Sequence, residues 1–212
     1  MECYRGMDIP TALEEICDPQ RMALVVYDMQ VGLLPQIEDA ALVTERAKNV
    51  LHAARSARVR TFFTRHMTLP LEVSGASAIR TAMAWQRTDN VDQVVSALPR
   101  DSPQFQLISE FTPLPSEAVL DKIAMSAFVG TPLDFALRDC GIEAFAIVGV
   151  ALEVGIEPTI RHGLDLGYLP VVVVDACGHG NSQAAQRSLD QLAFFGGSVP
   201  TDSDTLCRLL DR

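Results

Sequence analysis

The sequence predicts an α/β protein in which helices cover both faces of a parallel β-sheet. Two observations support this fold class. Short continuous apolar runs, such as Met-Ala-Leu-Val-Val-Tyr at 22–27, are typical of strands that are buried on both faces. These runs alternate along the chain with longer segments of helical spacing, and such alternation predicts parallel strands joined by right-handed crossovers.

The first half of the chain contains two predicted strands joined by a helix. The strand at 22–27 is followed by helical spacing over residues 35–59, with an apolar stripe on one face and charged residues outside it. A short second strand is predicted at 60–64. Residues 66–116 contain five prolines and the only tryptophan, and only 75–88 fits a helix. A segment of this length commonly forms a lid, a pocket wall or a subunit contact.

After residue 116 the alternation resumes and continues to the end of the chain. Thr131 and Pro132 are typical of a helix cap and first turn, Gly167 of a helix end, and Asn181 or Ser182 of a further cap. The predicted elements are strands at 118–122, 144–150, 170–175 and 198–201, and helices at 131–139, 153–166, 181–194 and the C-terminus.

Length and composition indicate one domain and exclude several classes of protein. We expect residues 1–20 to form an arm and residues 21–212 to form a single domain. A net charge of -10 without a Lys/Arg cluster argues against nucleic-acid binding. Five cysteines without CxxC pairs argue against a zinc site or a disulfide framework and favour a reducing cytoplasm. The apolar runs fall short of the ~20 residues that cross a bilayer, so no membrane association is expected.

Polar side chains follow the predicted strands at their carboxyl ends, where open α/β folds place their chemistry. Asp28 directly follows the first strand, with Gln30 two residues later, and Lys122 ends the strand at 118–122. A lysine at this position can meet Asp28 across the edge of the sheet. The structural alternatives are a turn or helix-cap role for Asp28 and a solvated surface position for Lys122.

A second candidate region lies where the strand at 144–150 runs into a helix. The position that would present a nucleophile in the first helical turn holds Gly155, which has no side chain. Backbone amides at such a helix start, near Ala151 and Gly155, can form an anion or oxyanion pocket, whereas the alternative is a glycine used for close packing. Cys177 is the candidate for a substitute nucleophile, although a small buried residue is the stronger interpretation.

The chain shows no metal-binding or nucleotide-binding motif. His66 follows the second strand and is placed to face the same sheet edge, but an isolated histidine is more often a hydrogen-bonded structural residue. The sequence contains no HxH or HExxH motif, and no strand is followed by GxGxxG or GxxxxGK[ST]. We therefore expect neither a metal ion nor another cofactor.

Four blocks of sequence fall in an order and spacing that is similar to a known family. They are Val-Val-Tyr-Asp-Met-Gln at 25–30, Leu-Asp-Lys-Ile-Ala-Met-Ser-Ala-Phe at 120–128 followed by Thr131, Gly-Val-Ala-Leu-Glu-Val-Gly-Ile-Glu-Pro-Thr at 149–159, and Gly-Tyr at 167–168 with Val-Val-Asp-Ala-Cys-Gly at 173–178. Over most of residues 20–205 the chain resembles the isochorismatase-like hydrolases, also called the cysteine hydrolase superfamily. The resemblance implies a three-layer α/β/α fold, a six-stranded parallel sheet of order 3-2-1-4-5-6, and a homodimer or homotetramer.

The resemblance also assigns roles to particular residues. In amidase members an Asp and a Lys activate a Cys that attacks a carbonyl; these positions correspond to Asp28, Lys122 and Gly155, so the Cys is absent. Many members have a cis bond at the position of Val150–Ala151, which orients backbone amides toward an oxyanion. The Asp-x-His metal pattern of the nicotinamidase branch is also missing.

Three further residues are candidates to line a substrate pocket. These are Gln30, His66 and Phe128.

The glycine at position 155 points to a mechanism without a covalent cysteine. The isochorismatase branch can carry glycine there and hydrolyses vinyl ethers: an Asp protonates the enol-ether carbon and water adds to the oxocarbenium ion. By resemblance, Asp28 is that acid and Lys122 orients it or the substrate, although the branch's Gly-Val-Tyr-Ala-His segment is absent from 149–153. We expect a hydrolase of a small molecule; the alternative is a catalytically inactive member that binds a small molecule or serves as a scaffold.

Overall fold

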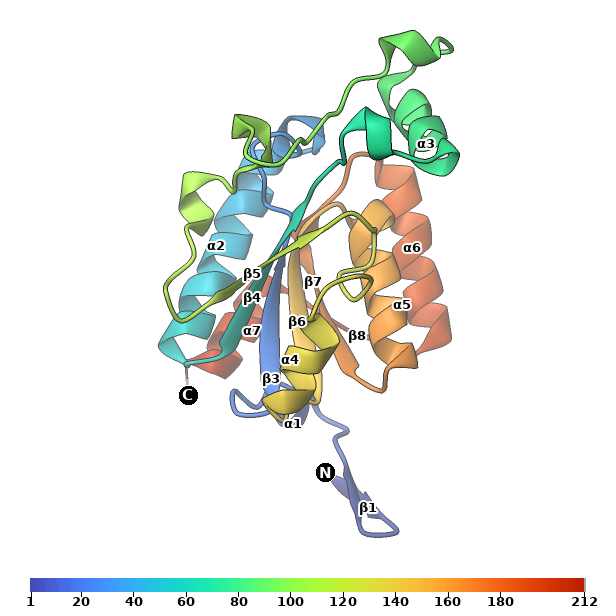
Figure 1. Cartoon of the computed structure of the whole chain (residues 1–212). Helices are drawn as coiled ribbons and strands as arrows, with labels where there is room; N and C mark the ends of the chain where they lie inside the picture. The colour runs from blue at the N-terminus through green and yellow to red at the C-terminus, as the bar shows by residue number, and fades with distance from the viewer. Residues whose placement is uncertain (212) are drawn as a thin grey trace.

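The computed structural model describes residues 1–211 as a six-stranded parallel sheet between two layers of helices (Figure 1). The strands lie in the order β5-β4-β3-β6-β7-β8, and each neighbouring pair is parallel. Counted along the chain, this is the order 3-2-1-4-5-6, so the predicted fold class and strand order are confirmed. Arg212, the last residue of the predicted domain, lies outside the described residues. The strands are β3 (Met22–Tyr27), β4 (Arg60–His66), β5 (Ala118–Lys122), β6 (Ala144–Val150), β7 (Leu169–Gly178) and β8 (Val199–Thr201).

The side chains of β3 alternate between two apolar cores, one on each face of the sheet. Those of Met22, Leu24 and Val26 pack toward one helix layer, and those of Ala23, Val25 and Tyr27 pack toward the other. The first layer contains α1 (Leu13–Ile16), α2 (Ala40–Ser56) and α7 (Ser203–Leu210), and the second contains α4 (Leu133–Asp139), α5 (Glu157–Asp165) and α6 (Ser182–Phe195). The last side chain of the central strand, Tyr27, therefore points toward the layer that includes position 155.

The long segment between β4 and β5 is mostly irregular, as its weak periodicity predicted. It contains α3 (Ala76–Gln86), inside the expected range 75–88, and the short 3-10 turns η2 (Leu71–Val73), η3 (Val91–Gln93), η4 (Pro103–Phe105) and η5 (Ser109–Phe111). No residue of α3 is buried, and Figure 1 shows this helix projecting beyond the carboxyl ends of the strands. The η4 and η5 turns are anchored to the body by buried Phe105 and Phe111.

Several boundaries differ from the predicted ones; the strand expected at 60–64, for example, continues to His66. The helix expected from residue 35 begins at Ala40, because Leu34–Gln36 forms a separate 3-10 turn (η1). The helix expected from residue 153 opens with a π-helical turn, η6 (Leu152–Ile156), before α5 begins. The strand expected to end at residue 175 continues to Gly178 and places Cys177 inside a buried strand.

The chain begins with a small hairpin at the opposite end of the molecule from α3. Strands β1 (Glu2–Tyr4) and β2 (Met7–Ile9) pair antiparallel, and Figure 1 shows them projecting from the body. Among residues 1–211, no helix is long and apolar enough to span a bilayer.

Gly149 lets the two central strands approach each other at the end that carries the candidate site. Its φ is +126°, and a Cβ built on it would lie 2.0 Å from the backbone oxygen of Tyr27. We expect Gly149→Ala to lower the free energy of unfolding by more than about 3 kcal/mol, because backbone strain and a clash with backbone act together. Urea unfolding measures this loss.

Gly141 supplies the matched control. Its φ is also positive, at +67°, but a Cβ there has open space around it. Gly141→Ala is therefore expected to cost only about 1 kcal/mol. Equal losses in the two variants would contradict the close approach at Gly149.

Candidate active site

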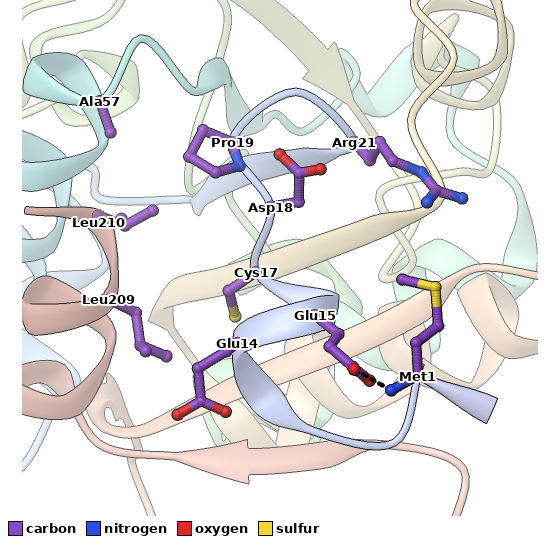
Figure 2. Close-up of a pocket in the computed structure, with 10 residues that line it drawn as sticks. All are labelled: Met1, Glu14, Glu15, Cys17, Asp18, Pro19, Arg21, Ala57, Leu209 and Leu210. Carbon is purple, nitrogen blue, oxygen red and sulfur yellow. Dashed lines mark hydrogen bonds and ion pairs between the residues drawn. The ribbon is translucent and has the colours of Figure 1, made fainter. Parts of the chain in front are cut away.

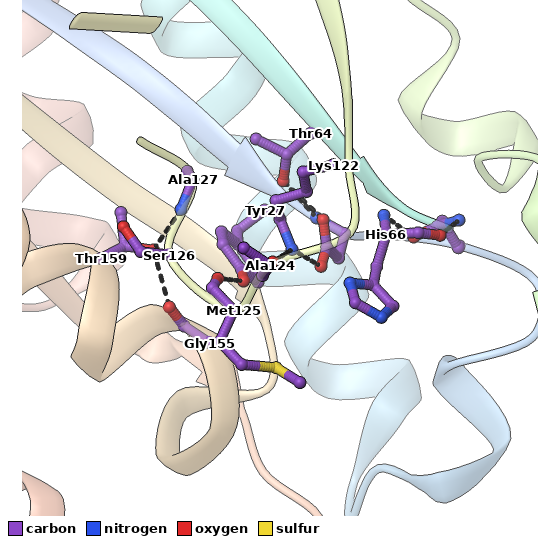
Figure 3. Close-up of polar contacts among 12 residues, drawn as sticks. Tyr27, Thr64, His66, Lys122, Ala124, Met125, Ser126, Ala127, Gly155 and Thr159 are labelled. Carbon is purple, nitrogen blue, oxygen red and sulfur yellow. Dashed lines mark hydrogen bonds and ion pairs between the residues drawn. The ribbon is translucent and has the colours of Figure 1, made fainter. Parts of the chain in front are cut away.

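Asp28 and Lys122 form a buried ion pair at the carboxyl ends of the strands. Figure 3 shows Lys122 with its neighbours Tyr27 and Thr64. Lys122 Nζ donates to Asp28 Oδ2 over 2.7 Å, and the two side chains expose only 1% and 4% of their surface. Asp28 follows β3 and Lys122 ends β5, so the pair bridges the end of β4, which lies between them. The two residues meet across the sheet edge, and Lys122 does not occupy a solvated surface position.

Asp28 is held by the backbone and by β4. Its φ of 50° is in the left-handed region, which costs a non-glycine residue about 1–2 kcal/mol. Thr64 Oγ1 donates to Asp28 Oδ1 over 2.6 Å, and the Asp28 amide donates to the Thr64 carbonyl over 3.2 Å. Both carboxylate oxygens therefore accept hydrogen bonds, an arrangement that suits an ionised carboxylate.

Lys122 is surrounded by groups that favour its charge, although burial opposes it. Besides Asp28, its ammonium contacts the Ala124 carbonyl at 3.2 Å and lies 4.3 Å from the centre of the Tyr27 ring. Burial lowers the pKa of Lys122, and the Asp28 carboxylate opposes this effect. Removing one partner of such a buried pair typically costs about 3–5 kcal/mol, because the other charge is left uncompensated.

Tyr27 occupies the space next to Gly155. A Cβ built on Gly155 would lie 2.0 Å from the Tyr27 hydroxyl oxygen. That hydroxyl donates to the Met125 carbonyl, and burial, with a contribution from Asp28, raises the pKa of the phenol well above its usual value (Figure 3). The phenol is therefore neutral, and close packing accounts for the glycine at position 155.

The backbone around Gly155 is hydrogen-bonded within the protein. The Val150–Ala151 peptide bond is cis, and the Gly155 amide donates to the Ala151 carbonyl over 3.0 Å. The Gly155 carbonyl accepts from Thr159 Oγ1 over 2.7 Å. For the Gly155 amide to bind a developing negative charge, the substrate would have to share or replace its bond to Ala151.

Gln30 and His66 are both buried beside the Asp28–Lys122 pair, but Gln30 forms hydrogen bonds to the backbone whereas the His66 imidazole is a titratable group. The Gln30 amide donates to the carbonyls of His66 (2.9 Å) and Phe105 (2.8 Å), and its oxygen accepts from the His66 amide at 2.7 Å. Gln30 thereby ties the ends of β3 and β4 to η4. Burial and the nearby Lys122 charge lower the pKa of His66 to about 4, so its imidazole is neutral at neutral pH.

Phe128 lies in an aromatic cluster of the second helix layer. Its ring stacks on Tyr168 at 5.7 Å between centroids and contacts the edge of Phe145 and the ring of His162. These contacts give Phe128 a packing role in the core.

Cys177 is also a core residue. Its thiol is buried in β7 and lies 3.4 Å from the Ile147 carbonyl, and burial raises its pKa. Because the thiolate is the reactive form, this environment suits the structural interpretation of Cys177.

A surface hollow of about 350 Å³ lies at the other end of β3 (Figure 2). It is lined by residues of α1, α7 and the loop that ends at Arg21, directly before β3, whereas Asp28 directly follows β3. Its buried thiol, Cys17, has a pKa raised to about 12 by burial. Within residues 1–211, no cluster of three or more His, Cys, Asp or Glu side chains is arranged to hold a metal ion.

Comparison with known proteins identifies the family. The model of the isochorismatase domain matches residues 22–204, which include the whole candidate site. The chain belongs to the isochorismatase family of hydrolases.

Among similar proteins, the ureidoacrylate amidohydrolase RutB of Serratia proteamaculans (strain 568) is 29% identical over 91% of this chain and 84% of its own length. A cysteine hydrolase from Pseudomonas syringae pv. phaseolicola 1448A has a similar structure, with a TM-score of 0.78 and 24% identity over 92% of this chain and 94% of its own. N-carbamoylsarcosine amidase from Thermoplasma acidophilum has a TM-score of 0.69 and 24% identity over 87% and 97%. The two structures share the fold of this chain.

The sequence did not single out Tyr27 or Thr64, two residues that shape the candidate site. A signal for Tyr27 was available. Side chains alternate between the two faces of the sheet along 22–27, and the large Tyr27 side chain has to fit under a helix segment that contains a glycine, Gly155. No comparable signal marks Thr64, because its contact with Asp28 depends on the register of β3 against β4.

The neutral state of His66 makes stability depend on pH. Its pKa of about 4 lies below the usual 6.5, so the unfolded chain binds more protons between these values. The stabilisation is complete above pH 6.5, is lost as the pH falls toward 4, and amounts to roughly 3 kcal/mol. The difference in unfolding free energy between the wild type and His66→Asn should therefore change by roughly 3 kcal/mol as the pH falls from 6.5 to 4.

His52, which is exposed on α2, provides the control for this measurement. His52→Asn shows how much an exposed histidine-to-asparagine change alters the profile by itself. A His66→Asn profile that runs parallel to the wild type would contradict a neutral, buried imidazole.

Proposed function

We propose that the protein hydrolyses a small molecule without a covalent enzyme intermediate, with Asp28 as general acid or base and Lys122 as its partner. One observation carries this proposal: the buried Asp28–Lys122 pair contacts the Tyr27 ring through the Lys122 ammonium, and the same ring lies against Gly155, which has no nucleophilic side chain. Such a pair can transfer a proton. An acyl-enzyme at position 155 would need a nucleophilic side chain there, and glycine has none.

The hydrogen bonds around Asp28 suit both directions of proton transfer. As a base, the carboxylate takes a proton from water that attacks the substrate. As an acid, Asp28 gives its proton to the substrate and becomes a carboxylate, which Lys122 and Thr64 then stabilise with the bonds of 2.7 and 2.6 Å. In vinyl-ether hydrolysis the proton would go to the enol-ether carbon, and water would add to the resulting oxocarbenium ion.

The names of the similar proteins suggest which substrates to test beside enol ethers. An amidohydrolase of ureidoacrylate and an amidase of N-carbamoylsarcosine act on C–N bonds of carbamoyl compounds. We therefore propose a substrate that contains an enol-ether C–O bond or a carbamoyl or amide C–N bond. The neutral His66 beside Lys122 supports this choice, because an uncharged imidazole can lie next to an uncharged substrate group without adding a further charge to the site.

A second candidate function is a binding or scaffold protein that has kept the fold but not the chemistry. It is favoured by the near-complete burial of the Asp28 and Lys122 side chains and by the phenol that fills the space beside Gly155. Binding of carbamoyl compounds or enol ethers without any turnover would support this candidate over hydrolysis.

We also propose that the protein acts as a homodimer or homotetramer in the cytoplasm. The projecting α3, which buries none of its residues, supports a subunit contact, since so short a helix gains little stability without packing. All five cysteines are free, which is consistent with a reducing compartment.

Replacing Asp28 tests the hydrolase proposal. Asp28→Asn removes the titratable proton but keeps the shape, so kcat should fall about 10²- to 10⁴-fold for any substrate found in a screen of enol ethers, ureido compounds and amides. Turnover is measured by chromatography of product, together with the melting temperature of each variant.

Asp121→Asn is the matched control, because Asp121 is next to Lys122 but pairs with Arg65 and Arg100 instead. It should retain turnover within a few fold. Unchanged turnover in Asp28→Asn would contradict the proposed role of Asp28.

A further inference from the structure

The space beside Gly155 is already filled by another side chain. A Cβ at position 155 would lie 2.0 Å from the hydroxyl oxygen of Tyr27, 2.6 Å from its Cζ and 2.7 Å from its Cε1. Real Cβ atoms essentially never approach other atoms so closely, and because the Tyr27 side chain is buried, its ring can move away only if its neighbours repack. Any side chain at position 155 therefore competes with the phenol for the same volume.

The phenol is fixed in this volume by contacts on several sides. Its hydroxyl donates to the Met125 carbonyl, and the Lys122 ammonium lies 4.3 Å from the ring centre (Figure 3). Tyr27 also directly precedes Asp28 in the chain, so the position of its ring is linked to the ion pair through both the backbone and Lys122.

We propose that Tyr27 and Gly155 form a matched pair, in which the Tyr27 phenol takes the place of a nucleophilic side chain at position 155 and so determines that this site works without a thiol. Tyr27 is thus a specificity-determining residue for the type of chemistry. With a smaller residue at position 27, position 155 accepts a cysteine next to Asp28 and Lys122. The role of Tyr27 in the type of chemistry rests on the proposed function, whereas the packing of Tyr27 against position 155 is tested by stability alone and can fail separately.

The geometry predicts which changes at position 27 make room. Tyr27→Phe removes the oxygen at 2.0 Å but keeps the ring carbons at 2.6 and 2.7 Å, so it relieves the conflict only in part. Tyr27→Val removes the whole ring. The cost of a side chain at position 155 should therefore fall in the order Tyr, Phe, Val at position 27.

Thermal unfolding of single and double variants measures this coupling. Gly155→Cys in the wild-type background should lower the melting temperature by roughly 5–10 °C or prevent folding, because it overpacks the core. In the Tyr27→Val background the same change should have little effect. Tyr27→Leu replaces Tyr27→Val if the latter does not fold.

Gly163 provides the control for a general loosening of the core. It lies in α5 in the same helix layer, but a Cβ there would meet Phe145 at 2.6 Å rather than Tyr27. Tyr27→Val should not relieve Gly163→Cys. Equal relief at both glycines, or an equal cost of Gly155→Cys in both backgrounds, would overturn the matched pair.

Reactivity of the introduced thiol tests whether it lies next to the charged pair. In Tyr27→Val/Gly155→Cys, iodoacetamide at pH 7 should alkylate the introduced thiol. Peptide mass spectrometry distinguishes this site from the five native cysteines. A neighbouring ammonium lowers a thiol pKa, so adding Lys122→Met should slow this alkylation roughly tenfold. An introduced thiol that is not alkylated, or whose alkylation rate is unchanged by Lys122→Met, would overturn the inferred placement of position 155 next to the ion pair.

Discussion

The candidate site depends on one buried ion pair, Asp28–Lys122. Two charges that are almost completely withdrawn from water are tolerated only when each compensates the other with good geometry. That geometry requires β3, β4 and β5 to be neighbours in register, since Asp28 follows β3, Thr64 in β4 binds its second oxygen, and Lys122 ends β5. Correct sheet assembly and formation of the site are therefore the same event.

Two ionisable neighbours of the pair, His66 and Tyr27, are neutral at neutral pH. Burial and Lys122 hold His66 in its uncharged form, and burial keeps the Tyr27 phenol protonated. The site thus contains one carboxylate and one ammonium, surrounded by polar groups that do not ionise near neutral pH. This composition suits proton transfer by Asp28 more than nucleophilic attack, and the only buried thiol in a nearby strand, Cys177, has a raised pKa.

Continuous apolar runs made the sheet predictable, and residues at strand ends made Asp28 and Lys122 predictable. Periodicity is a local property, so it located every strand of the sheet but misplaced the start of α2 and missed the π-helical turn η6. Contacts that depend on the packing of distant segments had weaker signals or none. Gln30 and Phe128 stay predictions as pocket-lining residues, and their contacts with the Phe105 carbonyl and with the rings of Phe145 and Tyr168 could not be predicted, because those partners come from segments far apart in sequence.

Gly155 illustrates the same limit. The sequence has a glycine where the family resemblance leads one to expect a nucleophile, but only the fold shows that the Tyr27 side chain occupies the space next to that glycine. The absence of a side chain at position 155 is therefore part of a packing arrangement and not an isolated loss. For the Asp28–Lys122 pair we propose hydrolysis by acid–base catalysis, which needs no side chain at position 155.

Intact-protein mass spectrometry of enzyme quenched during steady-state turnover tests this chemistry most directly. Hydrolysis by proton transfer through Asp28 predicts that the protein keeps its unmodified mass at every time point while product accumulates. A fraction of the protein whose mass is increased by that of a substrate fragment, covalently bound to one of its side chains, would contradict this mechanism.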